Sequence, residues 1–99
     1  MPSQTNGDLY KPDWDSITTI SNGFVAPSLG FIYLTLHVHS SGVNGSKIYV
    51  NEKLISRSHL NGGGSPMCSD FPFSIILKSG DKITWTADST TISYFVPLK

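Results

Sequence analysis

The chain has 99 residues, of which 14% are charged and 11% aromatic, and its 7 Lys and Arg balance 7 Asp and Glu. This length suits one domain, the aromatic content argues against a disordered chain, and zero net charge disfavours binding to nucleic acid or an anionic membrane, since both usually need a basic patch. No apolar run reaches the length of about 18 residues expected for a membrane-spanning helix, and a single cysteine excludes an intrachain disulfide.

The first twelve residues are polar and include two prolines. They lack the apolar centre of a secretion signal, so we expect a flexible leader or the end of a linker over 1–12 and a head domain over 13–99. Tyr10 and Trp14 lie at this junction. We expect Trp14 to pack on the domain and anchor the first strand, although two aromatics here would also suit a patch that stacks on sugars.

The rest of the chain shows no helix-period pattern of useful length. Short alternating stretches recur instead, separated by turn-forming residues, which is typical of strands joined by turns. The predicted strands are 17–20, 23–25, 31–39, 47–50, 54–55, 71–77, 82–87 and 91–98. Seven or eight such strands predict an all-β, antiparallel sandwich or barrel.

The strand predicted over 31–39 has two distinct faces. One face carries four aliphatic side chains and predicts a core: Ile32, Leu34, Leu36 and Val38. The other carries two aromatics, a threonine and a histidine: Phe31, Tyr33, Thr35 and His37. In the last strand, alternation assigns Phe95 to this outer side and three neighbours to the core: Ile92, Tyr94 and Val96. Exposed aromatics on a small neutral domain usually mark an interface, so we predict contact with other copies of the same chain.

Three segments occur in a familiar order: "GFVAPSLGFIYLTLHVHSSG", "KIYVNEKLI" and "LKSGDKITWTA", followed by a final "YFVPLK". Together they resemble the tumour-necrosis-factor-like superfamily, which includes the globular heads of the first complement component. The match covers roughly residues 20 to 98. It implies a jelly-roll sandwich of ten strands or slightly fewer, assembled as a homotrimer whose strand after Gly30 packs around the three-fold axis.

The chain departs from the complement-type heads because it is shorter and contains no Gly-x-y repeat. Its charge-poor composition, rich in Ser, Thr, Gly and Asn, is similar to the C-terminal knobs of bacteriophage fibres. This resemblance implies a virion or extracellular location and a non-catalytic head that attaches to a glycan or protein receptor on a host cell. The alternative is a structural trimerisation cap or capsid-decorating module without a ligand.

Receptor contacts are expected from two loops, 40–46 and 60–70, because loops at the end of a sandwich often carry binding. Their candidate residues are Asn44, His59, Asn61, Met67 and Asp70. Cys68 lies in the same stretch, and we expect a partly buried thiol without a catalytic partner.

His37 and His39 form a His-x-His pair on one face of a strand. Two imidazoles at this spacing can chelate a metal ion, and three copies around an axis would supply six nitrogens. We favour a place in the subunit interface for both histidines and expect no cofactor.

Three aspartates are predicted at turns, where this residue type often caps the backbone: Asp70, Asp81 and Asp88. A calcium site is the alternative reading, since oxygen ligands suit that ion. The sequence marks neither the paired carboxylates of a glycosidase nor a Ser/His/Asp arrangement, so we do not expect an enzyme.

Overall fold

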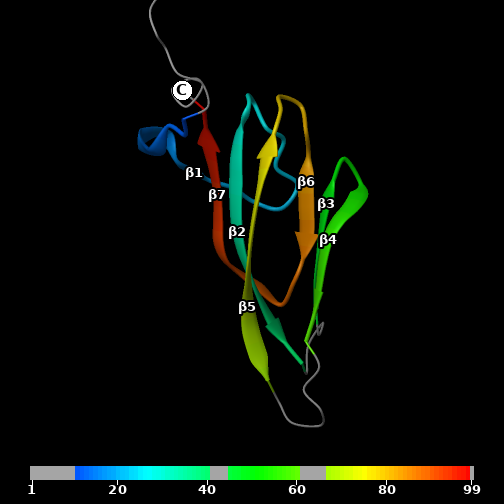
Figure 1. Ribbon diagram of the computed structural model, residues 1–99. Helices are drawn as coiled ribbons and strands as arrows, with labels where there is room; N and C mark the ends of the chain where they lie inside the picture. The colour runs from blue at the N-terminus through cyan, green and yellow to red at the C-terminus, as the bar shows by residue number, and fades with distance from the viewer. Residues whose placement is uncertain (1–10, 41–44, 61–66, 99) are drawn as a thin grey trace, which may run out of the picture.

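The computed structural model describes residues 11–40, 45–60 and 67–98, which form two antiparallel sheets facing each other (Figure 1). The elements in chain order are η1 (Trp14–Ser16), β1 (Thr18–Thr19), β2 (Gly30–His39), β3 (Gly45–Val50), β4 (Lys53–His59), β5 (Cys68–Leu77), β6 (Ile83–Thr86) and β7 (Ser89–Pro97). One sheet has the strand order β1-β7-β2-β5 and the other β4-β3-β6. The predicted all-β sandwich is therefore confirmed, as are the positions of most predicted strands.

The predicted 23–25 strand is reduced to an isolated bridge between Val25 and Lys82. The strand predicted over 71–77 is longer than expected, because β5 begins at Cys68, three residues earlier. Residues 1–10 of the predicted leader lie outside the described residues, but Pro12 forms a bridge with Leu98. The sandwich therefore includes the last residue that we had assigned to the leader.

Strand β2 organises the four-stranded sheet because it has a long partner on each side. It pairs with β5 from Gly30 opposite Leu77 to His39 opposite Cys68, and with β7 on its other edge. Burial along β2 alternates as the sequence predicts, since the four aliphatic residues of its core face are 0–1% exposed. Trp85 of β6 closes the core from the second sheet, and its indole N–H donates a hydrogen bond to Thr90 at 3.0 Å.

The prediction for β7 is wrong in phase. Phe95 is 3% exposed and belongs to the core, where its ring lies 5.1 Å from that of Phe24. Ile92 and Tyr94, which we had assigned to the core, are exposed on the outer side of the sheet. Val96, assigned with them, is fully buried as predicted, but it lies opposite Phe31 and not in the core cluster.

The reason is that both faces of β7 carry apolar residues, so alternation by itself does not reveal which face is buried. Its register against β2 decides, by placing Phe95 opposite the core residue Ile32. Gly30 provides the space, because a Cβ atom there would lie 2.6 Å from the Phe95 ring.

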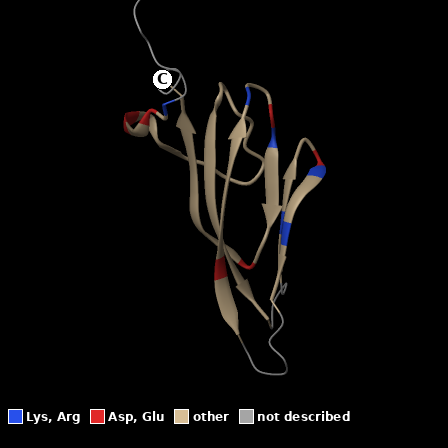
Figure 2. Cartoon of the chain, viewed as in Figure 1, with Lys and Arg blue, Asp and Glu red and all other residues tan. Residues whose placement is uncertain are grey.

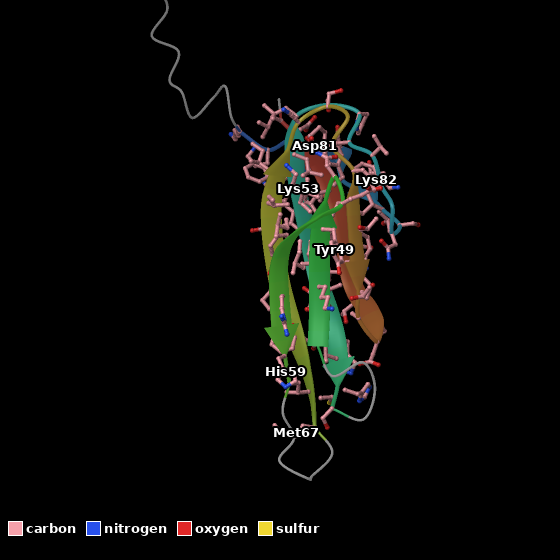
Figure 3. All side chains as sticks on the ribbon, turned by 90° about the vertical axis from the view of Figure 1, so that its right-hand side faces the viewer. Tyr49, Lys53, His59, Met67, Asp81 and Lys82 are labelled. Atoms are coloured by element: carbon pink, nitrogen blue, oxygen red, sulfur yellow. The ribbon has the colours of Figure 1, made fainter. Side chains whose placement is uncertain are left out.

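Two turns that are joined by hydrogen bonds close the end of the sandwich where Asp81 lies (Figure 3). Asn51 and Glu52 join β3 to β4 with φ angles of 52° and 70°, a tight turn in left-handed backbone. The Asn51 amide donates to the Asp81 carboxylate at 3.0 Å, and that carboxylate also accepts the Lys78 backbone N–H at 3.0 Å. These two hydrogen bonds, with the Lys78 charge, lower the pKa of Asp81 below its usual value.

Two of the three predicted aspartate turns are confirmed. Asp81 closes the turn just described, and Asp88 accepts the His39 backbone N–H at 2.6 Å. Asp70 instead lies within β5, so its predicted turn is wrong. The alternation of exposed and less exposed residues in β5 begins before Phe71. The residues there are mostly polar, so the sequence shows no apolar alternation that would predict a strand.

Candidate functional site

The register of the four-stranded sheet gathers large side chains on its outer side. Phe31 is flanked by Val96 of β7 and Ile76 of β5, and Tyr33 is flanked by Tyr94 of β7. The helix η1 adds one ring from the edge. We refer to the resulting surface as the aromatic face, defined as Trp14, Phe31, Tyr33, Ile76, Ile92 and Tyr94.

Four of the six side chains of the aromatic face are exposed, and the other two, Phe31 and Tyr33, are half-buried. Trp14 is 53% exposed, Ile76 46% and Tyr94 38%. The Trp14 ring lies 5.6 Å from the Tyr33 ring, which in turn lies 6.1 Å from the Phe31 ring, so the three form a continuous row. These spacings are those of stacked and tilted aromatic pairs, and the rings therefore present one shared apolar surface.

The aromatic face also lacks charge at its centre. Strands β2 and β7, both described over their full length, contain no Lys, Arg, Asp or Glu (Figure 2). A shallow groove of about 310 Å³ runs beside Tyr33 between Pro72 and Ile92. A surface of this kind favours an apolar, shape-complementary partner over an ionic one.

The predicted interface residues are only partly assembled on this surface. Phe31, Tyr33, Thr35 and His37 lie on the outer side as expected, whereas Phe95 does not. The exposed residues that we missed are Trp14, Ile76, Ile92 and Tyr94. A signal for Ile76 existed, because it alternates with the core residues Ile75 and Leu77.

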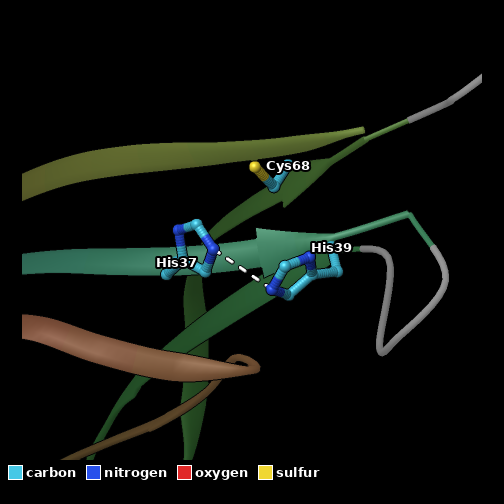
Figure 4. Close-up of side chains that lie close together, drawn as sticks. All are labelled: His37, His39 and Cys68. Atoms are coloured by element: carbon cyan, nitrogen blue, oxygen red, sulfur yellow. Dashed lines mark hydrogen bonds between the residues drawn. The ribbon is translucent and has the colours of Figure 1, made fainter. Parts of the chain in front are cut away.

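His37 and His39 lie at the other end of the same outer side. Their rings meet edge to face with centroids 4.6 Å apart and Nε2 atoms 3.2 Å apart (Figure 4). The other ring nitrogen of His37 lies 2.7 Å from a carboxylate oxygen of Asp70. Cys68 is exposed beside them, so the predicted partly buried thiol is wrong.

Of the predicted receptor-binding residues, Asn44 and Asn61 lie outside the described residues. His59 and Met67 are exposed and lie toward the same end of the molecule, away from Asp81 and Lys82 (Figure 3). The carboxylate of Asp70 pairs with the ring of His37.

The outer side of the three-stranded sheet carries a second groove, of about 310 Å³. Its lining combines an aromatic ring with basic and polar side chains: Lys47, Tyr49, Arg57, Ser58, His59 and Thr86. This combination can stack against and hydrogen-bond a polar ligand. His59 thus lies in the groove as well as at the end of the sandwich.

Comparison with protein-family models and with curated proteins finds no match for this chain. Among the described residues, no helix has the length and apolar character needed to cross a membrane.

Proposed function

We propose that this chain is a non-catalytic, homotrimeric binding head of jelly-roll type, placed at the tip of a bacteriophage fibre. In this role it attaches the virion to a glycan or protein receptor on the host cell. The observation that carries the proposal is the aromatic face, which has no charge at its centre and leaves four of its six side chains exposed in a single chain.

The occupant proposed for the aromatic face is a second copy of the same chain. Burial of apolar surface stabilises an assembly by about 25 cal/mol per Å², and a standard interface removes roughly 800 Å² from each partner. Zero net charge lets copies approach without long-range repulsion. In a ring of three copies, each chain would cover the aromatic face of a neighbour, which is exposed to water in a single chain.

The strand order supports the jelly-roll part of the proposal. The connections β2 to β3, β4 to β5, β5 to β6 and β6 to β7 each pass from one sheet to the other. Repeated crossing between two antiparallel sheets is a feature of jelly rolls. The long strand after Gly30 also lies inside the sheet that bears the aromatic face, where the family resemblance places the three-fold axis.

Receptor contact is proposed for the groove on the opposite sheet and the adjoining end of the sandwich. Tyr49 offers a ring, while Lys47, Arg57 and His59 offer hydrogen-bond donors. Three identical sites on one trimer would act together, and their avidity can exceed the affinity of each site by about 10²–10⁴-fold.

The test of this role is adsorption of the labelled protein to a panel of candidate host bacteria and to an array of bacterial surface glycans. We expect saturable binding that Arg57→Ala and His59→Ala weaken and that Lys82→Ala, at the far end of the sandwich, leaves unchanged. A protein that forms trimers yet adsorbs to none of these surfaces would instead be a structural cap.

A further inference from the structure

Two neighbouring strands bring four side chains of metal-binding types to one small area. His39 lies opposite Cys68 and His37 lies opposite Asp70 in the pairing of β2 with β5. All four point to the outer side of the sheet, because each alternates with residues that face the core. Directly opposed residues have Cβ atoms about 4.5–5.5 Å apart, so the register alone makes this cluster compact.

The nitrogen geometry matches that of two ligands on one ion. A tetrahedral zinc ion with Zn–N bonds of 2.0–2.1 Å holds its nitrogen ligands about 3.3 Å apart. The two Nε2 atoms are 3.2 Å apart here, in a contact that needs one proton between them. A metal ion that replaces this proton would lie to one side of the line between the two nitrogens, so each ring would turn toward the ion while the nitrogen spacing stays nearly the same.

Asp70 prepares the His37 ring for this role. Its carboxylate oxygen lies 2.7 Å from His37 Nδ1, and a carboxylate can only accept, so Nδ1 carries the proton. The Nε2 atom is therefore left with its lone pair directed at the cluster. Metal-bound histidines commonly have such a carboxylate on the other ring nitrogen, where it orients the ring and raises its basicity.

Cys68 supplies the third donor. Its Sγ atom and one ring nitrogen of each histidine all lie within 4.8 Å of one another. A zinc site requires about 3.6 Å between sulfur and nitrogen, a gap of roughly 1 Å that rotation of an exposed side chain can close. A thiolate donor favours zinc over the oxygen-preferring ions Mg²⁺ and Ca²⁺.

The backbone around the cluster is held in place on both sides. Beyond the last pair of β2 and β5, the backbone N–H of Ser40 donates to the Met67 carbonyl at 2.9 Å, and Met67 N–H donates to the Ser40 hydroxyl at 2.9 Å. On the other side, Asp88 N–H donates to the His37 carbonyl at 3.0 Å. The ligands thus stand on paired strands and not on a free loop, which favours a preorganised site.

We propose that a single chain binds one Zn²⁺ ion through His37 Nε2, His39 Nε2 and Cys68 Sγ. Asp70 acts as a positioning residue, and solvent occupies the fourth position of the tetrahedron. This site differs from the six-nitrogen arrangement considered from the sequence, because it needs neither a trimer nor a three-fold axis. It therefore stands or falls independently of the proposed attachment role.

The test is titration of the full chain with ZnCl₂ by calorimetry, in a non-thiol reductant, followed by CoCl₂ titration in the spectrophotometer. We expect one Zn²⁺ per chain and a Co²⁺ form with tetrahedral visible bands and a sulfur-to-cobalt charge-transfer band. Cys68→Ser should abolish the charge-transfer band, and His39→Ala should remove the tetrahedral spectrum. Asp70→Asn should weaken zinc affinity by about 10–100-fold, the usual effect of losing an outer hydrogen bond.

His59→Ala is the matched control, since this third histidine is exposed on β4 and does not belong to the cluster. It should leave both titrations unchanged, and MgCl₂ and CaCl₂ should give no binding signal. Less than one Zn²⁺ per chain at saturation would overturn the proposal. So would zinc binding that survives both ligand substitutions or that requires His59.

Discussion

The two outer surfaces of this sandwich differ sharply although each covers a twisted antiparallel sheet. The β1-β7-β2-β5 sheet presents the aromatic face, with Trp14 and Ile76 about half exposed and no charge on β2 or β7. The β4-β3-β6 sheet presents Lys47, Arg57 and Thr86 around a single ring, Tyr49. An antiparallel sheet normally has one solvated side. The second surface is closer to that description, although Leu54 beside Tyr49 is 49% exposed.

In a single chain, the core between the two sheets is closed by residues outside the aromatic face. They include three residues that are no more than 6% exposed: Leu34, Ile83 and Trp85. The contacts among the Trp14, Tyr33 and Phe31 rings contribute to the stability of a single chain, but the exposed parts of the aromatic face stay in contact with water in an isolated monomer. We therefore attribute this exposed surface to association, and attribute the polar surface to contact with water and ligand.

The largest expected effect comes from placing a charge on each surface in turn. Tyr33→Glu on β2 should convert trimers to monomers, because a buried charge without a partner costs about 3–5 kcal/mol. Tyr49→Glu on β3 is the matched change on the polar surface and should leave assembly intact. Light scattering on both variants distinguishes them, and equal behaviour would remove the contrast between the two surfaces.

The next largest effect is on the free energy of unfolding, which should differ between substitutions on the inner and the outer side of β2. Leu34→Ala should lower the free energy of unfolding by about 2–5 kcal/mol, as is usual for truncation in a closed core. Thr35→Ala, one residue along, should change it by less than about 0.5 kcal/mol, the range of ordinary surface changes. Urea unfolding in the Tyr33→Glu background excludes any contribution from assembly. Similar losses for both variants would mean that the outer side is also part of the monomer core.

A smaller effect on the free energy of unfolding is expected at the turn that joins β3 to β4. Glu52 has a φ of 70°, a conformation that costs a residue with a side chain about 1–2 kcal/mol. Glu52→Gly should therefore raise the free energy of unfolding by about 1 kcal/mol and give the preferred Asn-Gly turn. Lys53→Gly, in the adjoining strand, should lower it by about 0.5–1 kcal/mol. A destabilised Glu52→Gly variant would contradict this account of the turn.

The smallest effect concerns Asp81, whose pKa is lowered mainly by the Asn51 side chain. A lowered pKa in the folded state stabilises the fold above the usual pKa of Asp, and this contribution is lost as pH falls through the folded value. Asn51→Gly keeps the left-handed turn but removes the donor, so the pKa of Asp81 should rise. An NMR titration of the Asp81 carboxyl measures it, and an unchanged pKa would show that Asn51 has no such influence.

The sequence predicted the buried side of a strand well where that side is aliphatic throughout and the other side is not. In β2, the alternation of Ile32 and Leu34 with polar or aromatic residues identified the core side correctly. In β7 it failed, because Phe95 and Tyr94 are both large aromatic residues and only the register against β2 separates them.

The side-chain cluster at the end of β2 shows a different limit. The His-x-His pair was visible in the sequence, but its proximity to Cys68 and Asp70 depends on a strand pairing across 29 to 33 residues. Glycines at 62–64 led us to predict a loop that reached Asp70, which concealed the first residues of β5. Which residues become cross-strand neighbours depends on the register of the two strands, and no local sequence pattern predicts that register here.

The central claim is that other copies of this chain cover the aromatic face. Sedimentation equilibrium of the purified protein at micromolar concentration tests it most directly. We predict a particle of three times the 10.8 kDa chain mass, and a single species of one chain mass at that concentration would contradict the account.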